Sequence, residues 1–169
     1  MGRVFFDTRK NVHLLDANYT ALDSDSGKVF VLNASSGSYT LTLPTDYAAD
    51  NTTGALTGWN CRVIIGTENT DPVTIYTGDG TDSGGDDFVG GLTLVAAQAS
   101  DTSSGANGRH IVPAANDCEI DLDHGGANTG GGKGSYIDII KLASNEWMVS
   151  GIIYTDDADC TGAALFTDN

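Results

Sequence analysis

Apolar and polar residues alternate along this chain with the two-residue period of β-strands. Residues 39–43 are typical, with Tyr39, Leu41 and Leu43 on one face and threonines on the other. Similar short segments, separated by turns rich in Gly, Asn, Asp and Ser, occupy residues 28–32, 59–66, 73–77, 92–95, 109–113, 117–123, 136–142 and 147–154. No segment longer than a few residues shows the 3.6-residue period of a helix. We therefore expect an all-β protein.

The clearest pair of strands is the hairpin formed by residues 136–142 and 147–154. The connection between them is short and polar, so the two strands should be antiparallel. A strand with one face in water should alternate strictly, but each arm contains two adjacent isoleucines, Ile139–Ile140 and Ile152–Ile153. The pattern predicts that both faces of the hairpin are covered, the second by another sheet, a long loop or another copy of the chain.

We expect an antiparallel β-sandwich, jelly-roll-like, over residues 16–155. Residues 1–15 have no turn signal and predict an extended N-terminal arm, although an edge strand on the chain's own sheet fits them equally well. Residues 156–169 form an acidic C-terminal tail whose Leu165 and Phe166 would dock either on the body or on a neighbour.

The chain is strongly acidic, with 23 acidic and 8 basic residues and a formal net charge of −15. Such a body repels phosphate backbones, so we expect no nucleic-acid partner. No apolar run approaches the length that spans a membrane, so we expect no membrane partner either.

No motif in the sequence predicts a catalytic, cofactor or metal site. Residues 78–91 concentrate four carboxylates, but their spacing matches neither an EF-hand nor a calcium-binding β-roll, so we expect a solvated loop. Residues 130–134 lack the positions of a phosphate-binding loop. The three histidines have no partner at a motif spacing, and they are His13, His110 and His124. We therefore expect a protein that is not an enzyme.

Four segments together resemble the β-sandwich domains of tailed-virus virion proteins: residues 25–32, 39–44, 59–65 and 145–151. The resemblance implies a trimeric module of the head-decoration, cement or fibre-tip type. On this basis we expect a structural virion protein, made in the host cytoplasm and bound to the major capsid protein on the capsid exterior as a homotrimer. The alternative is a receptor- or carbohydrate-binding module of a tail fibre or spike, in which Trp59, Tyr76 or Tyr19 would stack on sugar rings.

Two sets of contact residues follow from these expectations. The arm should bind the capsid mainly by burying two phenylalanines, each contributing about 1.5–3 kcal/mol, whereas exposed ion pairs contribute about 0–1 kcal/mol each. The arm residues concerned are Arg3, Phe5, Phe6, Arg9 and Lys10. The subunit interface should involve the four hairpin isoleucines, Ile139, Ile140, Ile152 and Ile153.

Overall fold

The computed structural model describes residues 11–45, 57–78, 86–96, 108–124, 130–143, 145–156, 160 and 165–168. The described residues form β-strands and no α-helix, which confirms the all-β prediction. A short 3-10 helix, η2, spans Asp23–Asp25. The strands are β1 (Val12–Leu15), β2 (Tyr19–Thr20), β3 (Lys28–Leu32), β4 (Tyr39–Thr42), β5 (Asn60–Ile65), β6 (Val73–Tyr76), β7 (Asp87–Ala96), β8 (Gly108–Ile111), β9 (Glu119–Leu122), β10 (Tyr136–Ala143), β11 (Glu146–Thr155) and β12 (Phe166–Thr167).

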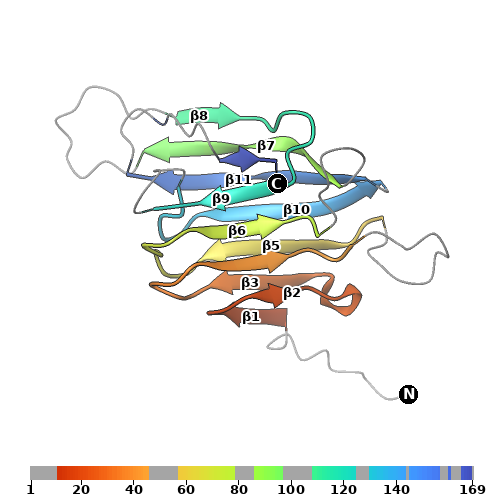
Figure 1. Cartoon of the computed structure of the whole chain (residues 1–169), viewed down its shortest axis with the longest axis horizontal. Coiled ribbons are helices and arrows are strands. Elements are labelled where there is room, and N and C mark those ends of the chain that lie inside the picture. The colour runs from red at the N-terminus through yellow and green to blue at the C-terminus, as the bar shows by residue number, and fades with distance from the viewer. Residues whose placement is uncertain are drawn as a thin grey trace, which may run out of the picture.

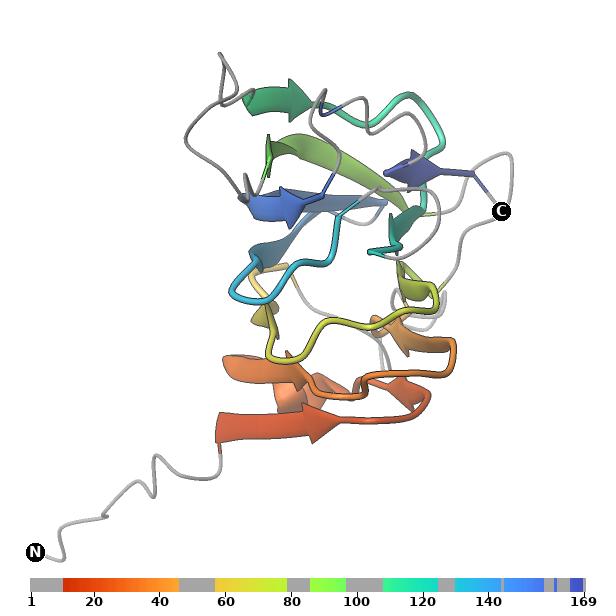
Figure 2. The same cartoon turned by 90° about the vertical axis from the view of Figure 1, so that its left-hand side faces the viewer.

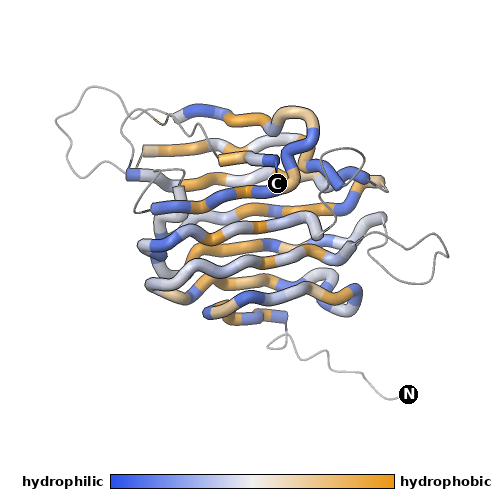
Figure 3. Tube along the Cα trace, viewed as in Figure 1, coloured by the Kyte–Doolittle hydropathy of each residue, from blue (hydrophilic) through white to orange (hydrophobic). Residues whose placement is uncertain are grey.

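The strands form two sheets that lie over one another as two layers (Figure 1, Figure 2). One sheet has seven strands in the order β1-β3-β5-β10-β11-β7-β8, and the other has five in the order β12-β9-β6-β4-β2. Alternate residues of the strands are buried between the layers, and Figure 3 shows apolar and polar residues following one another along the strands. They form one hydrophobic cluster to which both sheets contribute, for example Phe30, Val63 and Ile137 from the first and Leu41, Ile75 and Ile120 from the second.

The first six strands wind between the two layers as a parallel coil. Strands β1, β3 and β5 lie side by side and parallel in the seven-stranded sheet, while β2, β4 and β6 do the same in the five-stranded sheet. Successive strands of the coil therefore lie in alternate sheets instead of pairing as hairpins. Both sheets are mixed, so the expectation of a purely antiparallel sandwich is not confirmed, and neither is a jelly-roll connectivity.

Hydrogen bonds between successive corners of the coil explain this arrangement. The corner at residues 33–38 lies against the corner at residues 66–72. The Gly37 N–H donates to the Asp71 carboxylate at 2.7 Å, and the Asn69 amide donates to the Gly37 carbonyl at 3.0 Å. Gly37 has φ of +89°, a backbone conformation that favours glycine. The polar residues of these turns thus bond from corner to corner across the coil.

The hairpin predicted from residues 136–154 is confirmed and lies near the middle of the seven-stranded sheet. Strands β10 and β11 pair antiparallel, with Ile139 opposite Val149 and Tyr136 opposite Ile152. β10 also pairs antiparallel with β5, and β11 pairs parallel with β7, so neither is an edge strand.

Both ends of the described chain are attached to the body. Residues 12–15, predicted as part of a detached arm or as an edge strand, form the edge strand β1. Near the C-terminus, β12 pairs antiparallel with β9 and the Leu165 side chain is buried. Of the two positions left open for Leu165 and Phe166, the structure shows the one on the chain's own body.

Candidate interaction surface

The outward-facing side of the seven-stranded sheet is unusually apolar. We call this surface the outer face. In β1 its side chains Val12 and Leu14 are 51% and 61% exposed, and Leu142 in β10 is 41% exposed. Its other large apolar side chains are partly exposed: Val29, Val31, Ile64, Val89, Val95, Ile140, Met148 and Ile152. A sheet face turned to water ordinarily carries polar side chains, so this face has the composition of a contact surface.

The centre of the outer face carries a charge pair that neutralises itself. Arg62 in β5 and Asp138 in β10 are cross-strand neighbours, and the guanidinium donates two hydrogen bonds to the carboxylate at 2.6 and 2.8 Å. The Asp138 hydrogen bond raises the pKa of Arg62. The guanidinium also lies 5.1 Å from the centre of the Tyr136 ring. Asp87 and Glu146 lie at one end of the face, where β7 and β11 begin.

The outward-facing side of the five-stranded sheet is different in kind. Its side chains are mostly hydroxyls and carboxylates: Thr20, Thr40, Thr42, Thr74, Tyr76, Glu119, Asp121 and Thr167. The Thr74 hydroxyl donates to Asp121 at 2.9 Å, and burial together with the Asp121 charge raises the pKa of Glu119. This side has the composition of a sheet in water.

A buried ion pair fixes one end of the core. Lys141 occupies a core-facing position of β10 and is 1% exposed, and Asp86 is 2% exposed. The Lys141 ammonium donates to the Asp86 carboxylate at 2.7 Å, and the Trp147 indole donates to the same oxygen at 2.9 Å. The ammonium also lies 4.7 Å from the centre of the Trp147 ring. Placing Asp86 in a solvated loop was therefore wrong.

A second buried carboxylate, Asp25, holds the corner between η2 and β3. It accepts hydrogen bonds from the Tyr19 hydroxyl, the Leu22 N–H and the Lys28 ammonium. Burial by itself raises the pKa of Asp25. The hydrogen bonds together lower this pKa by more than burial raises it, so the pKa of Asp25 lies below its ordinary value. The cluster ties three segments together.

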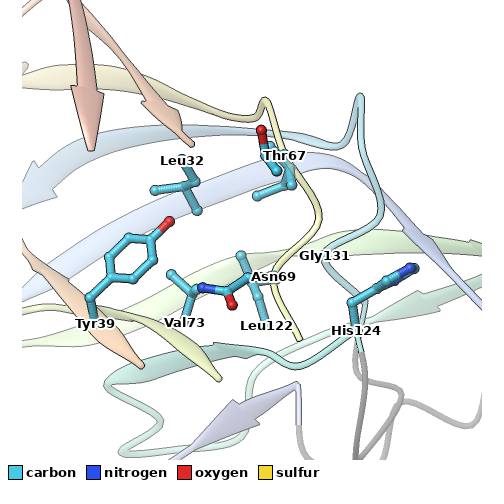
Figure 4. A pocket seen from close by; sticks show the side chains of 9 residues that line it. Leu32, Tyr39, Thr67, Asn69, Val73, Leu122, His124 and Gly131 are labelled. Atoms are coloured by element: carbon cyan, nitrogen blue, oxygen red, sulfur yellow. The ribbon is translucent and has the colours of Figure 1, made fainter. Parts of the chain in front are cut away.

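A small cavity lies between the layers near the corners of the coil (Figure 4). The Tyr39 hydroxyl points into it, whereas the His124 ring points away from the Tyr39 side. The space open to the centre of a water molecule is about 10 Å³, the scale of a single water. This cavity is too small for an organic substrate.

The histidines of the structure lie apart from one another. His13 stacks near Tyr19 with ring centres 4.3 Å apart, and His110 lies 3.4 Å from the Thr93 hydroxyl. His124 contacts carboxylates of Glu68 at 3.6 Å and Asp156 at 3.5 Å. Within the described part of the chain, no three His, Cys, Asp or Glu side chains come together as metal ligands.

None of the described segments forms a helix long and apolar enough to cross a membrane.

Calcium should leave the thermal stability of this protein unchanged. Most of the acidic loop, residues 79–85, lies outside the described residues, and its spacing matches no calcium motif. An ion that binds only the folded protein raises the unfolding temperature. Differential scanning calorimetry in calcium and in chelator should therefore give the same midpoint, with magnesium as the control for a general salt effect. A rise specific to calcium would contradict this expectation.

Comparisons with protein-family models, with curated proteins and with solved structures find no match to this chain.

The structure places the predicted contact residues unequally. Ile139 and Ile153 are 0% exposed and belong to the chain's own core, so only Ile140 and Ile152 are available on the outer face. The five arm residues lie outside the described residues: Arg3, Phe5, Phe6, Arg9 and Lys10.

The aromatic residues suggested for stacking on sugars are placed less favourably than expected. Trp59 is buried, packs edge-on against Trp147 with ring centres 5.4 Å apart, and donates its indole N–H to the Leu22 carbonyl. Tyr19 donates a hydrogen bond to Asp25 and packs against Phe30. Of the three suggested aromatic residues, Tyr76 is the one that lies on an outward-facing side. The suggestion that Trp59 stacks on a sugar is therefore wrong.

Proposed function

We propose that this chain is a structural virion protein, a homotrimeric head-decoration protein bound to the major capsid protein on the outside of a tailed-virus capsid. The observation that carries the proposal is the apolar outer face on an otherwise acidic, two-layer β protein. Such a molecule is suited to packing against other proteins. The four strand segments that resemble virion β-sandwich domains support the same function, and a jelly-roll-like sandwich is part of the proposal.

The distribution of charge also supports a position on the capsid exterior. A net charge of −15 disfavours contact with a packaged genome and suits a surface that faces solvent. Manufacture in the host cytoplasm and delivery to the virion follow from the proposal.

Counting copies on purified virions tests this function. Quantitative mass spectrometry, calibrated with the isolated protein and the major capsid protein, should find hundreds of copies per particle. A few copies per particle, located at the tail, would favour the receptor- or carbohydrate-binding alternative. That alternative has one observation in its favour, a shallow depression of the outer face lined by Asn60, Arg62, Asp138 and Ser150.

Removing the N-terminal residues should abolish attachment to the capsid. Deleting residues 2–10 leaves β1, which begins at Val12, so the body should stay folded. Replacing Phe5 and Phe6 by Ser should weaken rebinding to stripped particles almost as much, because each buried phenylalanine contributes about 1.5–3 kcal/mol. Replacing Arg3, Arg9 and Lys10 by Gln should weaken it less, because exposed ion pairs contribute about 0–1 kcal/mol.

Rebinding is measured at low and high salt with circular dichroism as the control for folding. A folded deletion variant that rebinds as tightly as the full chain would show that the anchor lies elsewhere.

A further inference from the structure

We infer that the outer face of the seven-stranded sheet is the surface through which this chain contacts a second copy of itself. The inference rests on the proposed homotrimer and deepens it by naming the contact surface. It does not depend on where the assembly is attached.

The first support is the contrast between the two outward-facing sides of the same molecule. The five-stranded sheet presents threonines and carboxylates, as expected for a side in water, and its threonines satisfy the carboxylates. The seven-stranded sheet presents many valine, leucine, isoleucine and methionine side chains on its outward-facing side, together with a few polar ones such as Arg62, Asp138 and Ser150. If water covered both sides, the two sides should carry similar proportions of polar side chains, and they do not.

The second support is electrostatic and concerns which surface two copies of this chain can share. Two bodies that each carry a net charge of −15 repel one another wherever their acidic surfaces meet. At the centre of the outer face the charged residues are Arg62 and Asp138, which neutralise each other at 2.6 Å. Contact through the centre of this face therefore brings no net charge together, and the acidic side chains of Asp87 and Glu146 lie at one end of the face.

The third support is area. Seven strands spaced about 4.8 Å apart make a face about 29 Å wide, and with about 3.3 Å per residue the average strand length is roughly 20 Å. The face therefore covers roughly 600 Å² in projection, before the relief of the side chains is added. A stable protein–protein contact buries about 800 Å² on each partner. The projected area is thus about three quarters of that value, and the relief of the side chains brings the outer face toward the size of one such contact.

The edge strand β1 provides the sharpest test. Val12 and Leu14 are more than half exposed, so replacing both with Glu adds charge to the outer face without opening the core. Thr40 and Thr42 have the same two-residue spacing on β4, on the opposite side of the molecule. The Thr40→Glu/Thr42→Glu variant has the same net charge and is therefore the control for the added charge.

Sedimentation equilibrium at micromolar concentration measures the outcome. The unmodified protein and the β4 control should be trimers, and the Val12→Glu/Leu14→Glu variant should dissociate at least tenfold more readily. Leu142→Glu, on the same face but on β10, should act in the same direction, and it replaces the β1 variant if that variant fails to fold. Circular dichroism establishes folding in each case.

Two results would overturn the inference: an unmodified protein that is monomeric, or outer-face variants that associate as tightly as the β4 control. The proposed function fails separately. If the protein self-associates through the outer face but is absent from virions, this inference holds and the proposed capsid role is wrong. If the protein is abundant in virions but monomeric when purified, the capsid role holds and this inference is wrong.

Discussion

Replacing Lys141 by Ala should lower the free energy of unfolding by about 3–5 kcal/mol, because it removes the cation from a buried ion pair and leaves the Asp86 carboxylate in the core. The ammonium lies 2.7 Å from that carboxylate, and both side chains are almost fully buried. Asp86→Ala should destabilise the protein for the converse reason. Urea denaturation followed by tryptophan fluorescence reports directly on this cluster, since Trp147 donates to Asp86.

Two controls distinguish the effect of burying the ion pair from the effect of losing an ion pair. Arg62→Ala removes an ion pair of similar length, 2.6 Å, that lies on the surface, and it should change the unfolding free energy far less. The double replacement Asp86→Leu/Lys141→Met removes both charges and should be much less destabilising than either single alanine change. Equal effects of Lys141→Ala and Arg62→Ala would contradict the burial argument.

Aspartate at position 139 should prevent folding, whereas aspartate at position 152 should leave a folded protein that no longer assembles. Ile139 points into the core and has no exposed surface, so a carboxylate there costs on the order of 4 kcal/mol or more. Ile152 points to the outer face and is partly exposed, so the isolated chain tolerates the charge.

Circular dichroism and sedimentation of the two variants distinguish these effects. Ile153→Asp belongs to the core group with Ile139, and Ile140→Asp belongs to the outer-face group with Ile152. If Ile152→Asp unfolds the protein as completely as Ile139→Asp does, the assignment of these positions to two different faces is wrong.

The alternation of residues was sufficient to predict β3 to β6 and β8 to β11, but not β2, β12 or the first half of β7. The segment around Ile120 and Leu122 is an example, since both side chains are fully or almost fully buried in β9. Pairing direction was predictable for the β10–β11 hairpin, whose connection is short, but not for the parallel strands of the coil. The turn at residues 33–38 has the composition of a hairpin turn, and what makes it a crossing between layers is its bonding to Asp71 and Asn69, more than thirty residues away.

The candidate surface could be predicted in part. The adjacent isoleucines indicated that a second face of the hairpin is apolar, and the structure shows that this face continues over β1, β3, β5 and β7. The two ion pairs were not predictable. Arg62 and Asp138 are in contact only because β5 and β10 are neighbouring strands. Lys141 occupies a core position, and its partner Asp86 directly precedes β7, which is far from β10 in the sequence.

Oxidation of Met148 tests most directly whether the outer face is covered by another copy. The chain has two methionines, Met1 and Met148, and Met148 lies on the outer face of β11. Dilute peroxide followed by peptide mass spectrometry compares its oxidation rate in the unmodified protein, in Thr40→Glu/Thr42→Glu and in Val12→Glu/Leu14→Glu. We predict slow oxidation in the first two proteins and faster oxidation in the dissociated third. Equal rates in all three at concentrations where the unmodified protein is assembled would contradict the account, because the contact between copies would then lie on another surface.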